Sequence, residues 1–204
     1  MKKLMLVVVV LLMLCGCQNK EEIQNEEIKE DVPQTAEEAE VSAVKEISDE
    51  EIYEMYLKNQ SFVEKNFYMG TPEWELGADW NRLDTENGAT PATVCHSVRE
   101  FKEYMKNNYE LSEAFIDKLI DSVSSFMYEK EGELWIVSAG RGGDITVGLE
   151  TGHEVLRQGD KIVLRISHEQ LEVETETVKG TFDTDNTLIY EDGKWVFEDI
   201  PAFR

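Results

Sequence analysis

Few residues in this chain have side chains suited to catalysis, and their spacing does not form a catalytic site. Three cysteines and three histidines occur: Cys15, Cys17, Cys95, His96, His153 and His168. Neighbouring side chains point apart on a strand and about 100° apart on a helix, so Cys95 and His96 do not make a nucleophile–base pair. We expect Cys95 to be a small buried apolar residue, although the sequence leaves open whether His153 or His168 approaches it. The chain is therefore not expected to be an enzyme.

Metal and cofactor sites are not expected either. Three cysteines exclude a disulfide framework and a cysteine-rich zinc site, and the histidines lack a spacing such as His-x-x-x-His. Asp183-x-Asp185-Asn186 begins like a calcium loop. That interpretation is excluded because Leu188 replaces the required glycine and Lys194 replaces the final glutamate. Carboxylates are so numerous that no acid–base pair can be singled out.

The glycine-rich segment 140–144 is the sharpest local feature of the sequence. No lysine follows it and the next element is predicted to be a strand, so it is not a phosphate-binding loop. One interpretation is a strand connection with a bulge. The other is a projecting loop that offers side chains and bare amides to a partner, from Arg141, Gly142, Gly143 and Asp144.

A long connection over residues 66–96 carries two tryptophans, Trp74 and Trp80, among residues typical of loops. Long connections of this kind are uncommon and are usually functional or disordered, and two tryptophans argue against disorder. We expect the tryptophans to cover the hydrophobic core. The alternative is an aromatic contact surface, because tryptophan is frequent at binding hot spots.

The N-terminal residues predict export and a lipid anchor. Lys2 and Lys3 precede an apolar run, Leu4–Leu14, which is too short to span a bilayer and suits a signal peptide. The following Leu-Cys-Gly-Cys resembles the lipobox of bacterial lipoproteins. This resemblance implies that residues 1–16 are a signal peptide and that Cys17 becomes lipidated, which anchors the chain stably. The expected location is the extracytoplasmic face of the cell membrane of a bacterium, in a Gram-positive setting.

The charge of the chain limits its partners. Acidic residues number 43 and basic residues 20, which gives a net charge of −23. This excludes nucleic acid as a partner, because phosphate binding needs a basic surface, and it excludes adsorption to anionic lipid through charge alone. Residues 17–47 are acidic, polar and without aromatic side chains, so we expect a flexible tether that holds a folded domain away from the membrane.

Residues 48–204 are expected to form a single α+β domain, with N-terminal helices followed by a curved antiparallel sheet. Ser48 and Glu51 form a capping box for a first helix that ends near Asn66. Ser97 begins a second helix, and Ser112 a third whose apolar stripe continues as far as Met127.

After Gly132 the apolar period changes to two, which predicts strands. The predicted strands are Leu134–Ala139, Ile145–Leu149, Lys161–Ser167, Leu171–Val178, Thr181–Phe182, Thr187–Tyr190 and Lys194–Phe197. Gly159-Asp160 and Asp192-Gly193 are hairpin turn signals, and Gly180 is a predicted bulge. The architecture expected from this order is cystatin-like or nuclear-transport-factor-2-like.

Several short motifs together resemble a known family. They are Phe101–Met105, Leu111-Ser112, Glu131–Trp135, Ala139–Gly143 and Asp192–Phe197. Over roughly residues 48–204 the chain is similar to the IseA-type inhibitors of cell-wall DL-endopeptidases. The resemblance implies a non-enzymatic protein that covers the active-site cleft of a cysteine peptidase that cuts peptidoglycan stem peptides. This chain departs from the family in its lipid anchor and its long acidic tether.

Three classes of function remain open at this point. An inhibitor would have a protruding loop and no deep pocket, and its partner would be a cationic cell-wall hydrolase attracted by the acidic surface. A small-ligand-binding lipoprotein would have a deep cavity of the nuclear-transport-factor-2-like type, lined by apolar side chains. An enzyme would bring titratable groups together near Cys95 or a histidine.

Overall fold

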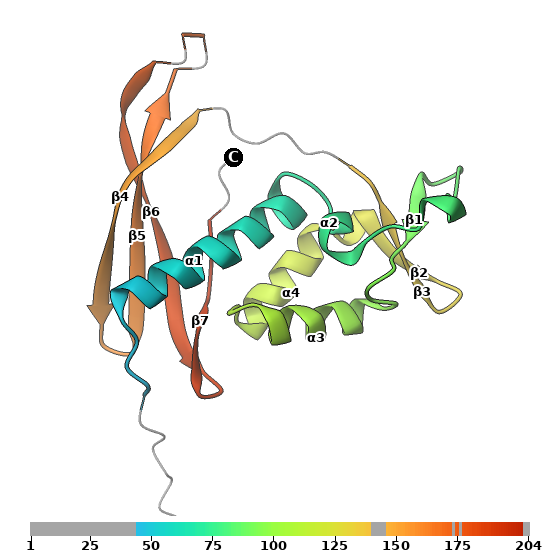
Figure 1. Cartoon of the computed structure of the whole chain (residues 1–204), viewed down its shortest axis with the longest axis horizontal. Helices are drawn as coiled ribbons and strands as arrows, with labels where there is room; N and C mark the ends of the chain where they lie inside the picture. The colour runs from blue at the N-terminus through green and yellow to red at the C-terminus, as the bar shows by residue number, and fades with distance from the viewer. Residues whose placement is uncertain (1–43, 140–145, 173, 176, 202–204) are drawn as a thin grey trace, which may run out of the picture. The chain divides into compact units, whose positions relative to one another are not determined.

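The computed structural model describes residues 44–139, 146–172, 174–175 and 177–201 (Figure 1). They belong to one compact unit, Val41–Arg204. Four α-helices are followed by most of the strands of two antiparallel sheets, so the predicted α+β class is confirmed. The signal peptide, the lipidation residue Cys17 and most of the predicted tether lie outside the described residues.

The first helix, α1, covers Asp49–Val63 and is capped as predicted. The Glu51 N–H donates to Ser48 Oγ at 3.2 Å, and the Ser48 N–H donates to a Glu51 carboxylate oxygen at 2.9 Å. The helix then widens into a π-helical turn, η1 (Glu64–Tyr68), before Gly70 and Pro72 end it. The predicted end near Asn66 therefore falls inside this turn.

The connection after η1 contains more regular structure than its loop-like sequence predicts. It forms a short helix α2 (Glu73–Leu76), a 3-10 turn η2 (Trp80–Arg82) and a strand β1 (Ala89–Pro91). These elements are too short to produce a periodic apolar pattern, which is why the sequence did not reveal them.

The next two helices begin as predicted but differ in length. Helix α3 (Val98–Asn108) starts at Ser97, whose hydroxyl accepts the Glu100 N–H at 3.1 Å. Helix α4 (Glu113–Ser122) is shorter than its apolar stripe predicts. The buried Val123 and Met127 continue the stripe through a 3-10 turn, η3 (Ser124–Phe126), into strand β2.

The strands form two sheets instead of the single expected sheet (Figure 1). The first sheet has the order β1-β3-β2, where β2 is Met127–Lys130 and β3 is Glu133–Val137. The second has the order β4-β5-β6-β7, with β4 Val147–Gln158, β5 Lys161–Leu171, β6 Val178–Glu191 and β7 Lys194–Phe197.

Several of the strand predictions need correction. The strands predicted at Thr181–Phe182 and Thr187–Tyr190 are parts of one continuous strand, β6. The predicted strand Ile145–Leu149 covers only the beginning of β4. The middle of β4 is exposed and polar, so it lacks the alternating apolar residues from which a strand is predicted. The predicted strand Leu171–Val178 is wrong, because a turn separates β5 from β6, and the Glu172 N–H donates to Thr177 O at 2.9 Å. The irregularity predicted at Gly180 is present, since the pairing register skips Lys179 beside it.

One hydrophobic core joins the helices to both sheets. Alternate residues of β5 face this core, and the cluster includes Ile52, Phe101, Phe115, Leu134, Ile162, Leu164, Ile166 and Phe197. The predicted hairpin between β6 and β7 places Phe197 there, with Asp192 and Gly193 at φ of 50° and 81°, as a tight hairpin turn requires.

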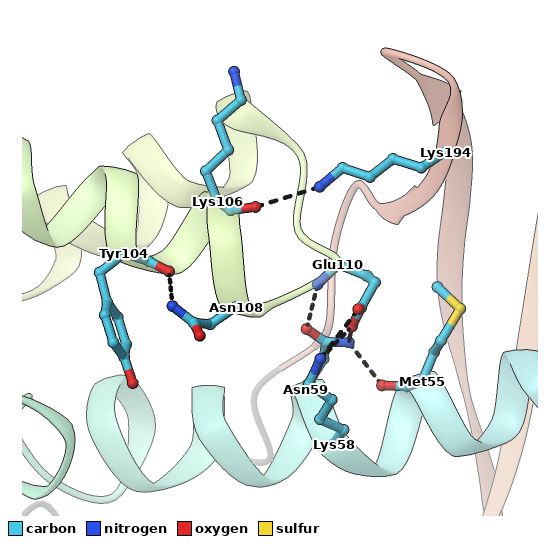
Figure 2. Close-up of polar contacts among 8 residues, drawn as sticks. All are labelled: Met55, Lys58, Asn59, Tyr104, Lys106, Asn108, Glu110 and Lys194. Atoms are coloured by element: carbon cyan, nitrogen blue, oxygen red, sulfur yellow. Dashed lines mark hydrogen bonds and ion pairs between the residues drawn. The ribbon is translucent and has the colours of Figure 1, made fainter.

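A buried amide fastens the connector between α3 and α4 to α1 (Figure 2). Asn59 is fully buried; its Nδ2 donates to Met55 O at 2.7 Å and to Glu110 Oε2 at 3.0 Å. Its Oδ1 accepts the Glu110 N–H at 3.0 Å, and Lys58 pairs with the same carboxylate at 3.1 Å.

The same connector also extends the four-stranded sheet. The Phe197 N–H donates to Glu110 O at 2.8 Å, and the Ser112 N–H donates to Phe197 O at 3.0 Å. Leu111 therefore pairs in parallel with the last residue of β7. Asn59 thus connects α1, the helix pair α3 and α4, and β7.

We predict that Asn59→Ala lowers the free energy of unfolding by about 2–3 kcal/mol, because it leaves the Glu110 N–H and carboxylate without a buried partner. Asn108→Ala is the matched control: its Nδ2 also donates to the carbonyl four residues earlier, at 2.8 Å, but on an exposed surface. That variant should change stability by less than about 0.5 kcal/mol. Urea unfolding of the three proteins measures both values, and equal effects of the two substitutions would contradict the role given to Asn59.

Candidate functional site

The connection over residues 69–94, which we call the aromatic connection, carries most of the exposed large apolar side chains of the described residues. Nine large apolar side chains are exposed in the described part of the chain, and five belong to this connection: Met69, Trp74, Trp80, Leu83 and Val94. Trp74 is 74% exposed and Trp80 is 59% exposed, so the expectation that they cover the core is wrong. Single exposed apolar residues are common, but their concentration on one segment is typical of an interaction surface.

The aromatic connection is held in shape by the carboxylate of Asp84. This group accepts the Glu86 N–H at 3.1 Å and the Asn87 side-chain amide at 3.0 Å, and it pairs with Lys130 of β2 at 3.3 Å. The hydrogen bond from the Asn87 amide is the main reason that the pKa of Asp84 falls to about 2. Backbone hydrogen bonds between Asp84 and Ala89 close the loop, at 2.8 and 3.2 Å.

Two further contacts fix the connection to the structure around it. Arg82 donates two hydrogen bonds to the Glu133 carboxylate, at 2.8 and 2.6 Å, and its guanidinium lies over the Trp135 ring. This pair lowers the pKa of Glu133 and raises that of Arg82. Gly77 has φ of 64°, and a Cβ there would collide with Thr93 Oγ1. The exposed tryptophans therefore stand on an ordered segment.

Cys95 is buried, as the sequence predicts, and burial raises the pKa of its thiol. His96 is exposed beside it. The other histidines lie on the four-stranded sheet, where the His153 ring stacks on Tyr53 at 3.9 Å and the His168 ring on Phe182 at 5.5 Å. The ring contacts of His153 and His168 are thus with Tyr53 and Phe182 of the helix and sheet. The raised pKa of the Cys95 thiol does not favour a nucleophile.

A first cleft, of about 350 Å³, lies against α1, β4 and β5. Glu150 and His168 line it, and the Tyr53 hydroxyl donates to Glu150 Oε1 at 2.9 Å, with His153 Nδ1 3.5 Å from the same oxygen. Burial lowers the pKa of His168. Sequence analysis missed this group because Tyr53 and Glu150 are 97 residues apart and lie in no motif.

A second cleft, of about 510 Å³, is lined by residues of α1, η1, α2 and α3 and by Tyr109. We call it the Glu75 cleft after its central carboxylate. Tyr104 and Tyr109 both donate their hydroxyls to Glu75 Oε1, and the bond to Glu75 raises the pKa of Tyr104 to about 12. Trp74 also lines this cleft. Among the lining residues, it is the one that the sequence analysis proposed as a binding residue.

The remaining predicted site residues, Arg141, Gly142, Gly143 and Asp144, lie outside the described residues. Within the described ranges, no group of three or more histidine, cysteine or carboxylate side chains is arranged to hold a metal ion. No helix in the same ranges has the length and apolarity needed to cross a membrane.

Two comparisons with known proteins found no match for this chain. No protein-family model matches it, and no curated protein matches it significantly. The site must therefore be interpreted from its own geometry.

We predict that the order of the aromatic connection depends on pH through Asp84. The folded pKa lies below the usual value of 3.8, so its contribution to stability is complete above about pH 4 and is lost as the pH falls toward about 2. Asp84→Asn should destabilise the connection at neutral pH and remove this part of the acid dependence. Amide exchange at Gly88 and Ala89, followed between pH 5 and 2, measures the effect.

Glu103→Gln is the control for this experiment, because it removes one exposed carboxylate from α3. It should leave exchange at Gly88 and Ala89 as in the unmodified protein. Identical pH profiles for Asp84→Asn and the unmodified protein would show that the carboxylate does not order the connection.

Proposed function

We propose that this chain is an extracytoplasmic, lipid-anchored protein that inhibits a peptidoglycan DL-endopeptidase by protein–protein contact through the aromatic connection. The observation that carries the proposal is the set of five exposed apolar side chains on an ordered segment. Tryptophan anchors dominate many protein interfaces, and a segment that is ordered before binding loses less entropy on association. The resemblance to IseA-type inhibitors supplies the class of partner.

Charge supports the same choice of partner. The net charge of −23 would attract a cationic hydrolase and raise its rate of association, with a strong dependence on salt. Lipid attachment at Cys17 would keep the inhibitor close to the enzymes that it controls. The segment 140–144 remains a proposed second contact, through Arg141 and Asp144.

The alternative is a small-ligand-binding lipoprotein, which is favoured by the cleft of about 350 Å³ against α1. Its volume lies within the range of small-molecule pockets. However, its lining includes Gln60, Glu64, Glu150 and His168 among the apolar residues. It is therefore less apolar than a dedicated ligand cavity, and Glu150 already accepts the Tyr53 hydroxyl.

We predict that the exported chain without its lipidated Cys17, residues 18–204, inhibits a DL-endopeptidase of the same organism and has no hydrolase activity of its own. The double variant Trp80→Ala, Leu83→Ala should raise the inhibition constant about 30-fold or more, because loss of a hot-spot anchor costs about 2 kcal/mol or more. Leu149→Ala is the matched control, since Leu149 is 76% exposed but belongs to β4. Digestion of purified cell wall, titrated with each protein, gives the inhibition constants.

Inhibition should also weaken as salt rises from low to physiological strength, where the Debye length falls to about 8 Å. Undiminished digestion by every DL-endopeptidase of the organism would remove the inhibitor proposal and favour the small-ligand binder. An equal effect of the Leu149 control would show that the aromatic connection is not the contact surface.

We predict that Cys17→Ser releases the protein from the membrane, because the substitution removes the sulfur to which lipid would be attached. Fractionation after a salt wash should find the unmodified protein with the membrane and the variant in the soluble fraction. Cys15→Ser is the matched control and should stay with the membrane. A Cys17→Ser variant that still sediments with membrane would contradict lipidation at this residue.

A further inference from the structure

A buried acceptor without a partner lies beside the Glu75 cleft. The π-helical turn η1 carries Asn66, which is 1% exposed and is among the residues that line the cleft. Its Nδ2 donates to Phe62 O at 2.9 Å, but its Oδ1 has no partner in the described part of the chain. Buried side-chain acceptors are nearly always satisfied, and π-helical turns occur frequently at functional sites. Both features favour a ligand that supplies a hydrogen-bond donor here.

Trp74 gives the same cleft an exposed aromatic face. The backbone at Gly70 approaches the indole closely, since a Cβ there would lie 3.5 Å from Trp74 Nε1 and 2.6 Å from Lys65 O. The indole therefore lies beside the π-helical turn that carries Asn66 and Lys65. An exposed flat ring next to polar groups suits a ligand with one apolar face and polar edges.

The carboxylate of Glu75 is held in position through hydrogen bonds to one of its two oxygens. Both tyrosine hydroxyls donate to Oε1, and Tyr109 is itself held by stacking on Phe62 at 3.8 Å. The hydrogen bonds to Glu75 from the described residues both reach Oε1, so Oε2 can accept a hydrogen bond from a ligand. A carboxylate that is already fixed in position accepts a hydrogen bond from a ligand hydroxyl or amide N–H with little loss of its own conformational entropy.

Two lysines, Lys58 and Lys65, line the cleft, and they differ in their partners. Lys58 pairs with Glu110, whereas Lys65 is exposed and makes no ion pair with the described residues. The unpaired ammonium of Lys65 can form a charge-assisted hydrogen bond with a carboxylate on a ligand.

From these contacts we infer that the Glu75 cleft binds a sugar that carries a carboxylate. The apolar face of the sugar ring stacks on Trp74, hydroxyl or amide N–H groups donate to Glu75 Oε2 and Asn66 Oδ1, and the carboxylate pairs with Lys65. The cleft volume of about 510 Å³ suits a ligand of this size. This activity is separate from the proposed inhibition, because it needs no hydrolase and no contact through Trp80 or Leu83.

The test uses the exported chain and two disaccharides of similar size. The acidic probe is N-acetylglucosaminyl-N-acetylmuramic acid, and the neutral probe is N,N′-diacetylchitobiose. Isothermal titration calorimetry should find the acidic sugar bound about tenfold more tightly, because one charge-assisted contact distinguishes the two. Trp74→Ala should abolish binding of both sugars, whereas the control Trp80→Ala should leave both affinities unchanged.

Lys65→Met tests the carboxylate contact separately. It should reduce the affinity for the acidic sugar to that for the neutral sugar and leave the latter unchanged. Trp74 and Lys65 are both exposed, so the variants should fold, which far-UV circular dichroism checks. Absence of binding to both sugars, equal affinities in the unmodified protein, or unchanged binding by Trp74→Ala would each overturn the inference. Because Trp74 also belongs to the aromatic connection, wall digestion with the Lys65→Met variant, which lies outside that connection, distinguishes loss of sugar binding from loss of inhibition.

Discussion

The buried amide of Asn59 is the contact on which the arrangement of helices and sheet depends. It satisfies both the N–H and the carboxylate of Glu110, and it thereby fixes the short connector between α3 and α4. That connector is also hydrogen-bonded to Phe197 of β7. A single polar group thus links three helices, α1, α3 and α4, and a sheet that contribute to the same core. An apolar residue in this place would leave backbone groups unsatisfied.

Helix α1 and its π-helical turn carry this link and also line both clefts. Tyr56 and Gln60 line the cleft of about 350 Å³, while Lys58 and Asn66 line the Glu75 cleft. The aromatic connection begins directly after the π-helical turn and is fastened through Asp84 and Arg82 to β2 and β3. The Glu75 cleft and the aromatic connection, to which we assign binding, are therefore formed by elements that are held in place by hydrogen bonds and ion pairs. This favours association with little loss of conformational entropy.

Local signals in the sequence predicted the beginnings of elements well. The caps at Ser48, Ser97 and Ser112 and the turn at Asp192-Gly193 each involve a few neighbouring residues, and the structure confirms all four. The ends of elements were harder to predict, because the apolar stripe after Ser112 continues through Met127 although the helix stops at Ser122.

The clefts could not be predicted, since they depend on residues distant in sequence. Glu75 meets Tyr104 and Tyr109 across separations of 29 and 34 residues. Trp74 and Trp80 were marked by residue type alone, and their exposure followed from the packing of the connection rather than from any pattern. The buried acceptor of Asn66 likewise arises from the π-helical turn, which the helical period at this point does not indicate.

Hydrogen–deuterium exchange of the exported chain, with and without a DL-endopeptidase of the same organism, tests the central claim most directly. If the aromatic connection is the contact surface, amides over residues 69–94 should gain protection in the complex, while those in the middle of β4 should exchange as in the free protein. Protection confined to the strands β4 to β6, or no change in exchange at any amide, would contradict the account.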